Sequence, residues 1–260
     1  MIQGNMRRLV FLFLAGFIAL PLRAAVPELL DAALQKIAAD HDRWAYTQEV
    51  VEKDDKGKVV SEAVVRFDPS KPYAEQFTPR SVDGKPPSDR QLRKYRRQGE
   101  KRGDRLEKAE REGKEPTRQT LGELMDIGHA TVVEENAQSV TYEVPLKKEG
   151  NNRLPPEKFR VTARVSKQTQ AFENIVVLLR EPLRAALIVK VKSGVGRLEF
   201  ETVNPKFAPA LTALHGGGTA SILFVSVGRS YDVKRSDFKR VKPYVERFGV
   251  KFGPLKAIDF

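Results

Sequence analysis

Four short runs between residues 159 and 203 have the character of β-strands, and they constrain the fold more than any other part of the chain. The first, 159–166, alternates apolar and polar residues, which is typical of a half-buried antiparallel strand. The second, 175–179, is apolar without a break, which predicts a strand covered on both faces. The third and fourth, 186–193 and 196–203, meet at a glycine-containing link that we expect to be a turn. Such short links favour an antiparallel meander, whose apolar face must be buried against something else.

Other segments add strands on both sides of this stretch. We expect a hairpin over 43–67, a third short strand over 73–77, and two strands near 132–133 and 140–146. The sequence His215-Gly-Gly-Gly218 is expected to be a hairpin turn, followed by strands over 221–227 and 231–242. The predicted fold class is therefore mainly β with a few helices.

An amphipathic helix precedes the first predicted strand. Pro27 suits the first turn of a helix, and Leu30, Leu34 and Ile37 then fall on one apolar stripe with polar residues around it. We expect this helix to cover the apolar face of the sheet.

The first 25 residues are typical of a secretory signal peptide. Arg7 and Arg8 precede an apolar run over 9–20, and small residues follow at Ala24 and Ala25, where cleavage is expected. The alternative is a membrane anchor, but the run is shorter than the roughly 20 residues that span a bilayer. We therefore predict an exported, periplasmic protein, with residues 26–260 forming one domain.

Export, together with the absence of cysteine, restricts the available chemistry. A chain with no Cys cannot use disulfides, thiol catalysis or thiolate metal sites. The chain has 46 Lys and Arg residues against 34 Asp and Glu, and an exported basic surface suits an anionic membrane surface or an acidic envelope protein rather than nucleic acid. The same surplus could serve solubility alone.

The basic residues are concentrated in a charged insert over 88–118. Ser88 and Gln91 fit a capping box, and residues 90–118 contain twelve Lys or Arg and six Asp or Glu. A helix that is polar nearly all round is exposed to solvent. Residues 90–118 are thus either a docking arm for a membrane surface or protein partner, or simply a solvated helical insert.

The sequence contains no recognisable catalytic or cofactor motif. The triglycine after His215 resembles an oxyanion-hole motif of hydrolases, but the partner motif G-x-S-x-G is absent. The three histidines are scattered, with no spacing typical of zinc ligands, and no glycine-rich phosphate loop opens a helix. We expect a non-catalytic protein without a cofactor or metal.

Several short motifs together resemble a known family. They are Trp44 and Tyr46 in the first strand, the segment Val65-Arg66-Phe67-Asp68-Pro69, and the turn Asp83-Gly84-Lys85. In this order, after a signal peptide and an amphipathic helix, the chain resembles the LolA-like superfamily of periplasmic outer-membrane lipoprotein carriers and related lipid-handling proteins. In the carriers a strand follows the Asp-Gly turn closely, whereas residues 86–118 intervene here, which indicates a divergent member.

This resemblance implies an incomplete, curved β-barrel whose apolar concave side is plugged by helices. It implies a carrier that binds the acyl chains of a lipid or lipoprotein and serves outer-membrane biogenesis by transport. The candidate lining residues are Trp44, Tyr46, Val65, Phe67, Phe77, Val161, Leu198, Phe200 and Leu223, with Leu30, Leu34 and Ile37 on the plug helix. The same alternation also fits a filled core. The alternative function is a periplasmic sensor or scaffold of the same fold that binds a protein partner through its basic insert.

Overall fold

The computed structural model describes residues 27–40, 43–112, 121–148, 155–186, 189–222 and 225–247. The predicted signal peptide over 1–25 lies outside the described residues, as does Leu223. Within the described part of the chain, no helix combines the length and the apolar character needed to cross a membrane.

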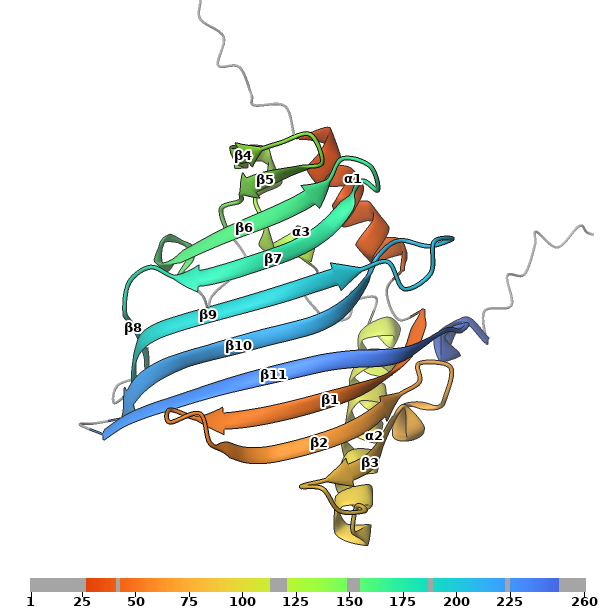
Figure 1. Cartoon of the computed structure of the whole chain (residues 1–260). Coiled ribbons are helices and arrows are strands. Elements are labelled where there is room, and N and C mark those ends of the chain that lie inside the picture. The colour runs from red at the N-terminus through yellow and green to blue at the C-terminus, as the bar shows by residue number, and fades with distance from the viewer. Residues whose placement is uncertain are drawn as a thin grey trace, which may run out of the picture.

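The described strands form one open antiparallel sheet, which confirms the prediction of a mainly β fold (Figure 1). Its eleven strands are β1 (Trp44–Asp54), β2 (Val59–Phe67), β3 (Phe77–Val82), β4 (Thr131–Glu135), β5 (Ser139–Glu143), β6 (Phe159–Ser166), β7 (Ala171–Leu179), β8 (Leu183–Ala186), β9 (Val189–Glu201), β10 (Ala210–Ile222) and β11 (Val225–Arg240). Their order is β3-β2-β1-β11-β10-β9-β7-β6-β5-β4, with β8 paired to β9. Because β3 and β4 stand at opposite ends of this order, the sheet does not close.

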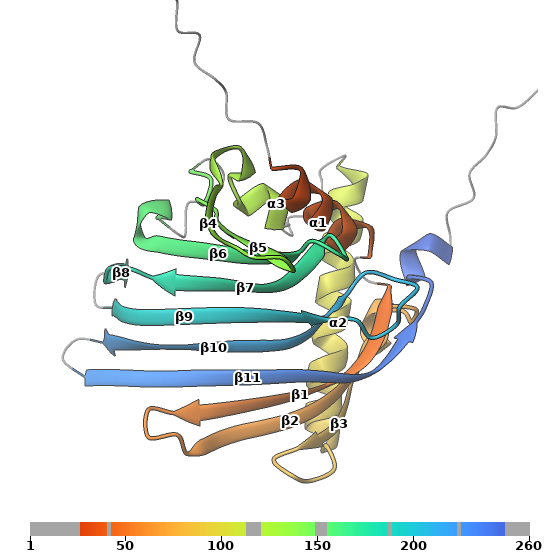
Figure 2. The ribbon, with the colours of Figure 1, turned by 45° about the horizontal axis from the view of Figure 1, so that its top comes forward.

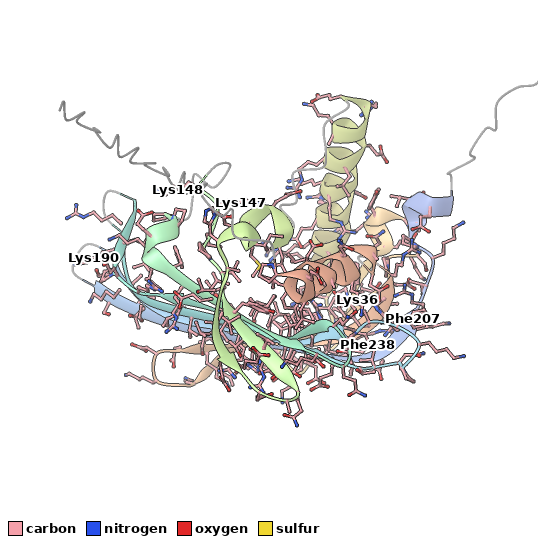
Figure 3. The ribbon with its side chains drawn as sticks, turned by 90° about the horizontal axis from the view of Figure 1, so that it is seen from above. Lys36, Lys147, Lys148, Lys190, Phe207 and Phe238 are labelled. Atoms are coloured by element: carbon pink, nitrogen blue, oxygen red, sulfur yellow. The ribbon has the colours of Figure 1, made fainter. Side chains whose placement is uncertain are left out.

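The helices lie on one side of this curved sheet, as Figures 2 and 3 show. They are α1 (Glu28–Ala39), α2 (Asp89–Arg111) and α3 (Leu121–Leu124), with four 3₁₀ turns: η1 (Tyr73–Glu75), η2 (Ile127–His129), η3 (Pro156–Lys158) and η4 (Tyr244–Arg247). α1 packs on β6 and β7, whereas α2 packs on η1 and β3. The two longer helices therefore cover opposite ends of the concave face.

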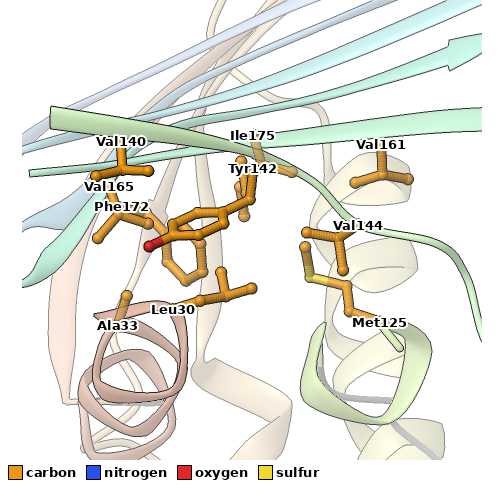
Figure 4. Packing of buried hydrophobic residues seen from close by; sticks show 11 residues of the cluster. Leu30, Ala33, Met125, Val140, Tyr142, Val144, Val161, Val165, Phe172 and Ile175 are labelled. Atoms are coloured by element: carbon orange, nitrogen blue, oxygen red, sulfur yellow. The ribbon is translucent and has the colours of Figure 1, made fainter. Parts of the chain in front are cut away.

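The main hydrophobic core lies beneath α1 (Figure 4). Leu30 and Ala33 of α1 are fully buried against Phe172 and Ile175 of β7, and Met125, which follows α3, closes the same cluster. Burying a side chain of the size of Leu or Phe contributes roughly 1.5–3 kcal/mol. The apolar stripe predicted from the sequence is therefore the stripe that anchors α1.

The prediction of turns at two glycine-rich segments is wrong. Residues 193–196 lie inside β9, and His215–Gly218 lies inside β10, where Gly216 pairs with Gly196 and Gly218 pairs with Gly194. None of these glycines has a positive φ, so their backbone suits a strand as well as a turn. The predicted third and fourth runs therefore belong mostly to one strand, β9, which extends over Val189–Glu201.

Two further predictions need correction. The run 175–179 is not covered on both faces, because Ile175 is buried whereas Leu178 is 44% exposed. The described helices cover only one side of the sheet, so an unbroken apolar run does not require two buried faces. The predicted strand over 73–77 is a 3₁₀ turn over Tyr73–Glu75, and β3 begins only at Phe77.

Candidate functional site

A row of aliphatic side chains crosses the middle of the concave face. Cross-strand pairing joins Ile175 of β7 to Leu198, Leu198 to Leu214, Leu214 to Val233, and Val233 to Val50 of β1. Directly paired residues in an antiparallel sheet point to the same face. Ile175 is in the core beneath α1, so the whole row faces the helices. We call Leu198, Leu214, Val233 and Val50 the central row.

The central row is half-buried rather than filled in. Next to it, Gly196 pairs with Gly216 across β9 and β10 on the same face. A Cβ atom at Gly196 would meet no atom within 4 Å, and one at Gly216 would touch only a carbonyl oxygen at 4.0 Å. The middle of the concave face is therefore an apolar floor without side chains at two adjacent positions, bordered by aliphatic groups.

A cluster of aromatic rings and arginines lies at the α2 end of the same face. The ring centroids of Tyr46 and Phe67 are 5.1 Å apart, and those of Phe67 and Phe77 are 4.7 Å apart. The Arg235 guanidinium carbon lies 4.4 Å from the centroid of Tyr46, and that of Arg102 on α2 lies 5.2 Å from Phe77. Each stacked guanidinium contributes about 0.5–2 kcal/mol while keeping its positive charge on this face.

Two glycines seat α2 against the sheet. A Cβ at Gly99 would lie 2.1 Å from the carbonyl oxygen of Tyr73, and one at Gly103 would lie 2.6 Å from its ring. Glycine lowers helix propensity, but here it allows close contact between the helix and η1.

The predicted capping pair is present at the start of α2: the Ser88 N–H donates to Gln91 Oε1 at 2.7 Å. The N-terminal part of α2 carries five basic and no acidic residues between Asp89 and Glu100, and these five are exposed: Arg90, Arg93, Lys94, Arg96 and Arg97.

The structure divides the described lining residues among four places. Trp44 lies at the start of β1, next to Phe207 and Phe238. Tyr46, Val65, Phe67 and Phe77 gather on β1, β2 and β3 at the α2 end of the concave face. Only Leu198 belongs to the central row. Val161 is in the core beneath the helices, together with Leu30, while Leu34, Ile37 and Phe200 are partly buried against that core.

Sequence reasoning missed most of the central floor. Val50, Leu214 and Val233 are ordinary members of alternating runs, and only their pairing shows that they meet. Gly196 and Gly216 were assigned to turns. Gly194 and Gly196 are two residues apart, as are Gly216 and Gly218. This period-two spacing is the signal that could have placed Gly196 and Gly216 on one face of a strand.

The opposite, convex face carries a polar cluster. His215 Nδ1 lies 2.9 Å from Asp232 Oδ1, and the Lys53 ammonium donates to Asp232 Oδ2 at 2.8 Å. The hydrogen bond with His215 contributes most, and the one from Lys53 next, to lowering the pKa of Asp232 below its usual value. A shallow depression of about 350 Å³ lies here, lined by Glu49, Val51, Lys53, His215, Asp232 and Lys234. Its lining contains one imidazole and two carboxylates but no cysteine, serine or threonine.

Polar groups border the floor at the end away from the aromatic cluster. The Tyr231 hydroxyl donates to Glu52 Oε1 at 3.2 Å, which raises the pKa of Tyr231, and Arg229 Nε lies 3.4 Å from the same oxygen. Among the described residues, no three His, Cys, Asp or Glu side chains are grouped closely enough to hold a metal ion. The described concave face therefore offers an apolar surface with charged groups at both ends.

Comparison with protein-family models, with curated proteins and with solved structures gave no match for this chain.

Proposed function

We propose that this protein is an exported, non-catalytic carrier that binds the acyl chains of a lipid or lipoprotein on its concave face. The observation that carries the proposal is the central row with its glycine floor, where an apolar surface stays half-exposed between two helix-covered ends. Each methylene group moved from water onto such a surface contributes up to about 0.8 kcal/mol.

The arrangement of the helices supports this proposal. In this proposal α1 corresponds to the plug helix that the resemblance to LolA-like proteins implies, and its Leu30, Leu34 and Ile37 pack at one end of the concave face. α2 borders the other end. A chain lying on Gly196 and Gly216 would be flanked by both helices, with its apolar surface facing the central row.

The first test is whether the exported protein carries lipid. Native mass spectrometry of the mature protein, followed by solvent extraction, should detect a bound amphiphile, and a fluorescent fatty-acid probe should bind and be displaced by it. A lipid-free mass together with no binding of the probe would contradict the proposal.

A matched pair of variants tests where the chain lies. Gly196→Phe places a large side chain on the floor, where nothing lies within 4 Å of the new Cβ, and should weaken probe binding about tenfold or more. Val195→Phe adds the same group at the next residue, which points to the opposite face and is 48% exposed, and should leave binding unchanged. Equal binding by both variants would place the acyl chain elsewhere.

A second candidate function is a sensor or scaffold that binds an acidic protein partner through α2. The five exposed basic residues of its N-terminal half favour it. Reversing two of these charges, as in Arg93→Glu with Arg97→Glu, should abolish partner capture and leave probe binding intact. If probe binding were lost as well, α2 would be part of the lipid site.

A further inference from the structure

The end of the concave face beneath the C-terminus of α1 contains a cluster of Trp44, Phe207, Arg240 and Asp40, which we call the head cluster. Trp44 and Arg240 are direct partners at the ends of β1 and β11. The Arg240 guanidinium carbon lies 5.0 Å from the Trp44 ring centroid and 4.4 Å from that of Phe207. Asp40 follows α1, and its Oδ1 accepts a hydrogen bond of 2.7 Å from Arg240 Nη2.

Three buried polar atoms of the head cluster have no hydrogen-bond partner among the residues that the structure describes. They are the donors Trp44 Nε1 and Arg240 Nη1 and the acceptor Asp40 Oδ2. Trp44 is only 8% exposed, so bulk water has little access to accept a hydrogen bond from its indole N–H. A buried donor or acceptor without a partner is costly, and three in one cluster point to a group that supplies the missing partners.

The chemistry of the missing group follows from these atoms. The two donors call for an anionic oxygen, whereas the free oxygen of Asp40 calls for an N–H or ammonium group close to it. A simple anion would satisfy the donors but be repelled by Asp40, and a simple cation would be repelled by Arg240. A group that carries both charges side by side satisfies all three atoms.

We propose that the head cluster binds a zwitterionic headgroup in which a phosphate stands next to a primary ammonium, as in an ethanolamine phospholipid. The phosphate accepts from Trp44 Nε1 and Arg240 Nη1, and the ammonium donates to Asp40 Oδ2. This inference rests on the proposed carrier function and adds the class of cargo to it.

The position of the head cluster suits an amphiphile whose chain lies on the floor. Trp44 and Val50 belong to the same strand and face the same side, six residues or about 20 Å apart. Tyr46 and Phe238, with centroids 5.7 Å apart, lie between them on that face. The head would thus be bound at one end of β1 while the chain runs along the strand toward the central row.

Phe207 is the group that a headgroup must displace. It comes from the connection between β9 and β10 (Figure 3) and is 37% exposed. Its ring meets the Trp44 ring edge-on, with the centroids 5.5 Å apart. The same ring lies 4.4 Å from the Arg240 guanidinium carbon, so we expect binding of a headgroup to require the Phe207 ring to turn away. Phe207→Ala should therefore bind the headgroup at least as tightly as the unmodified protein.

The sole tryptophan of the chain makes the site directly observable, because its indole N–H gives one resonance in a ¹⁵N–¹H spectrum. The probes are four lipids with the same 16-carbon chain: lysophosphatidylethanolamine, lysophosphatidylcholine, lysophosphatidic acid and monoacylglycerol. We expect the ethanolamine lipid to bind about tenfold or more tighter than the other three, since choline has no N–H, lysophosphatidic acid has no ammonium and monoacylglycerol has no charge. Its phosphate should shift the indole resonance. Free phosphoethanolamine, which lacks the chain, should shift the same resonance only at far higher concentration.

Two variants separate recognition from folding. Arg240→Gln should weaken binding of the ethanolamine lipid about tenfold or more. Asp40→Asn breaks the same ion pair but keeps the guanidinium, so it should retain phosphate binding and lose only the preference for ethanolamine over choline. Arg197→Gln, on the convex face, should change neither.

The outcomes distinguish this inference from the function on which it rests. Equal affinity for all four lipids, or a preference for lysophosphatidic acid, would overturn the headgroup assignment and leave acyl-chain binding in place. No binding of any of the four would overturn both. If Arg240→Gln fails to fold, the headgroup preference of Asp40→Asn still decides the matter.

Discussion

The two helix-covered ends of the concave face are held together by different interactions. Under α1 the contacts are apolar and fully buried, with Leu30, Phe172 and Ile175 at or near zero exposure. Under α2 the rings of Phe67 and Phe77 stack with the Arg102 guanidinium, and although Phe67 is buried, Phe77 remains partly open to solvent. The comparison shows that α1 is part of the main hydrophobic core, whereas α2 packs on the edge of the sheet through η1 and β3.

The largest expected effect lies in the core under α1. Phe172→Ala should lower the free energy of unfolding by about 3–5 kcal/mol, because the fully buried ring leaves a cavity among β6, β7 and α1. Phe77→Ala, at the α2 end, should cost less than half as much, because that ring is only partly buried. Urea unfolding of both variants checks the comparison, and equal losses would show that the two ends are equally integral to the fold.

An intermediate effect is expected where α2 is seated. Gly→Ala within a helix normally stabilises by up to about 1 kcal/mol. Gly99→Ala should instead destabilise by roughly 1–3 kcal/mol, because its methyl group would meet the Tyr73 carbonyl oxygen. Hydrogen exchange should quicken in α2 and stay unchanged in β6 and β7. Gly122→Ala in α3, where nothing lies within 4 Å, is the matched control and should be neutral or slightly stabilising.

The smallest effect is expected on the convex face, away from both helices. The pKa of Asp232 is lowered in the folded protein, so its hydrogen bonds to His215 and Lys53 stabilise the fold above the ordinary pKa of an aspartate. That contribution is lost as the pH falls through the lowered pKa. The groups are about one-third exposed, so Asp232→Asn should cost at most about 1 kcal/mol at pH 7, and this cost should shrink as the pH falls toward 2. A cost that persists unchanged at pH 2 would mean that charge is not its source.

The sequence predicts the local structure of this chain better than its register. Period-two alternation located β1, β2 and β6, and helical spacing located the stripe of α1, because those side chains meet water on one face and protein on the other. Glycine misled the prediction at Gly196 and Gly216, since the residue is compatible with both turns and strands. Burial of β7 was overpredicted because an apolar run does not report how many faces are covered.

The candidate site was less accessible to prediction than the fold. The described residues among its proposed lining do face the concave side, but most of them pack in the core or in the aromatic cluster. The central row joins residues from four strands, and its composition depends on the pairing β1-β11-β10-β9, in which the N-terminal hairpin joins the last strand of the chain. No local pattern fixes a contact between residues almost 200 positions apart, such as Val50 and Val233.

The open ends of the sheet bear on how this protein behaves at high concentration. An unclosed sheet presents free backbone groups at β3 and β4, and long flat edges of this kind invite copies to add strand to strand. Here both edge strands are short. β3 contains Pro79, which has no N–H to offer, and β4 is interrupted by a bulge between Val132 and Glu134 and ends in two glutamates. The molecule can therefore keep a concave apolar face uncovered without its edges acting as templates for a fibre.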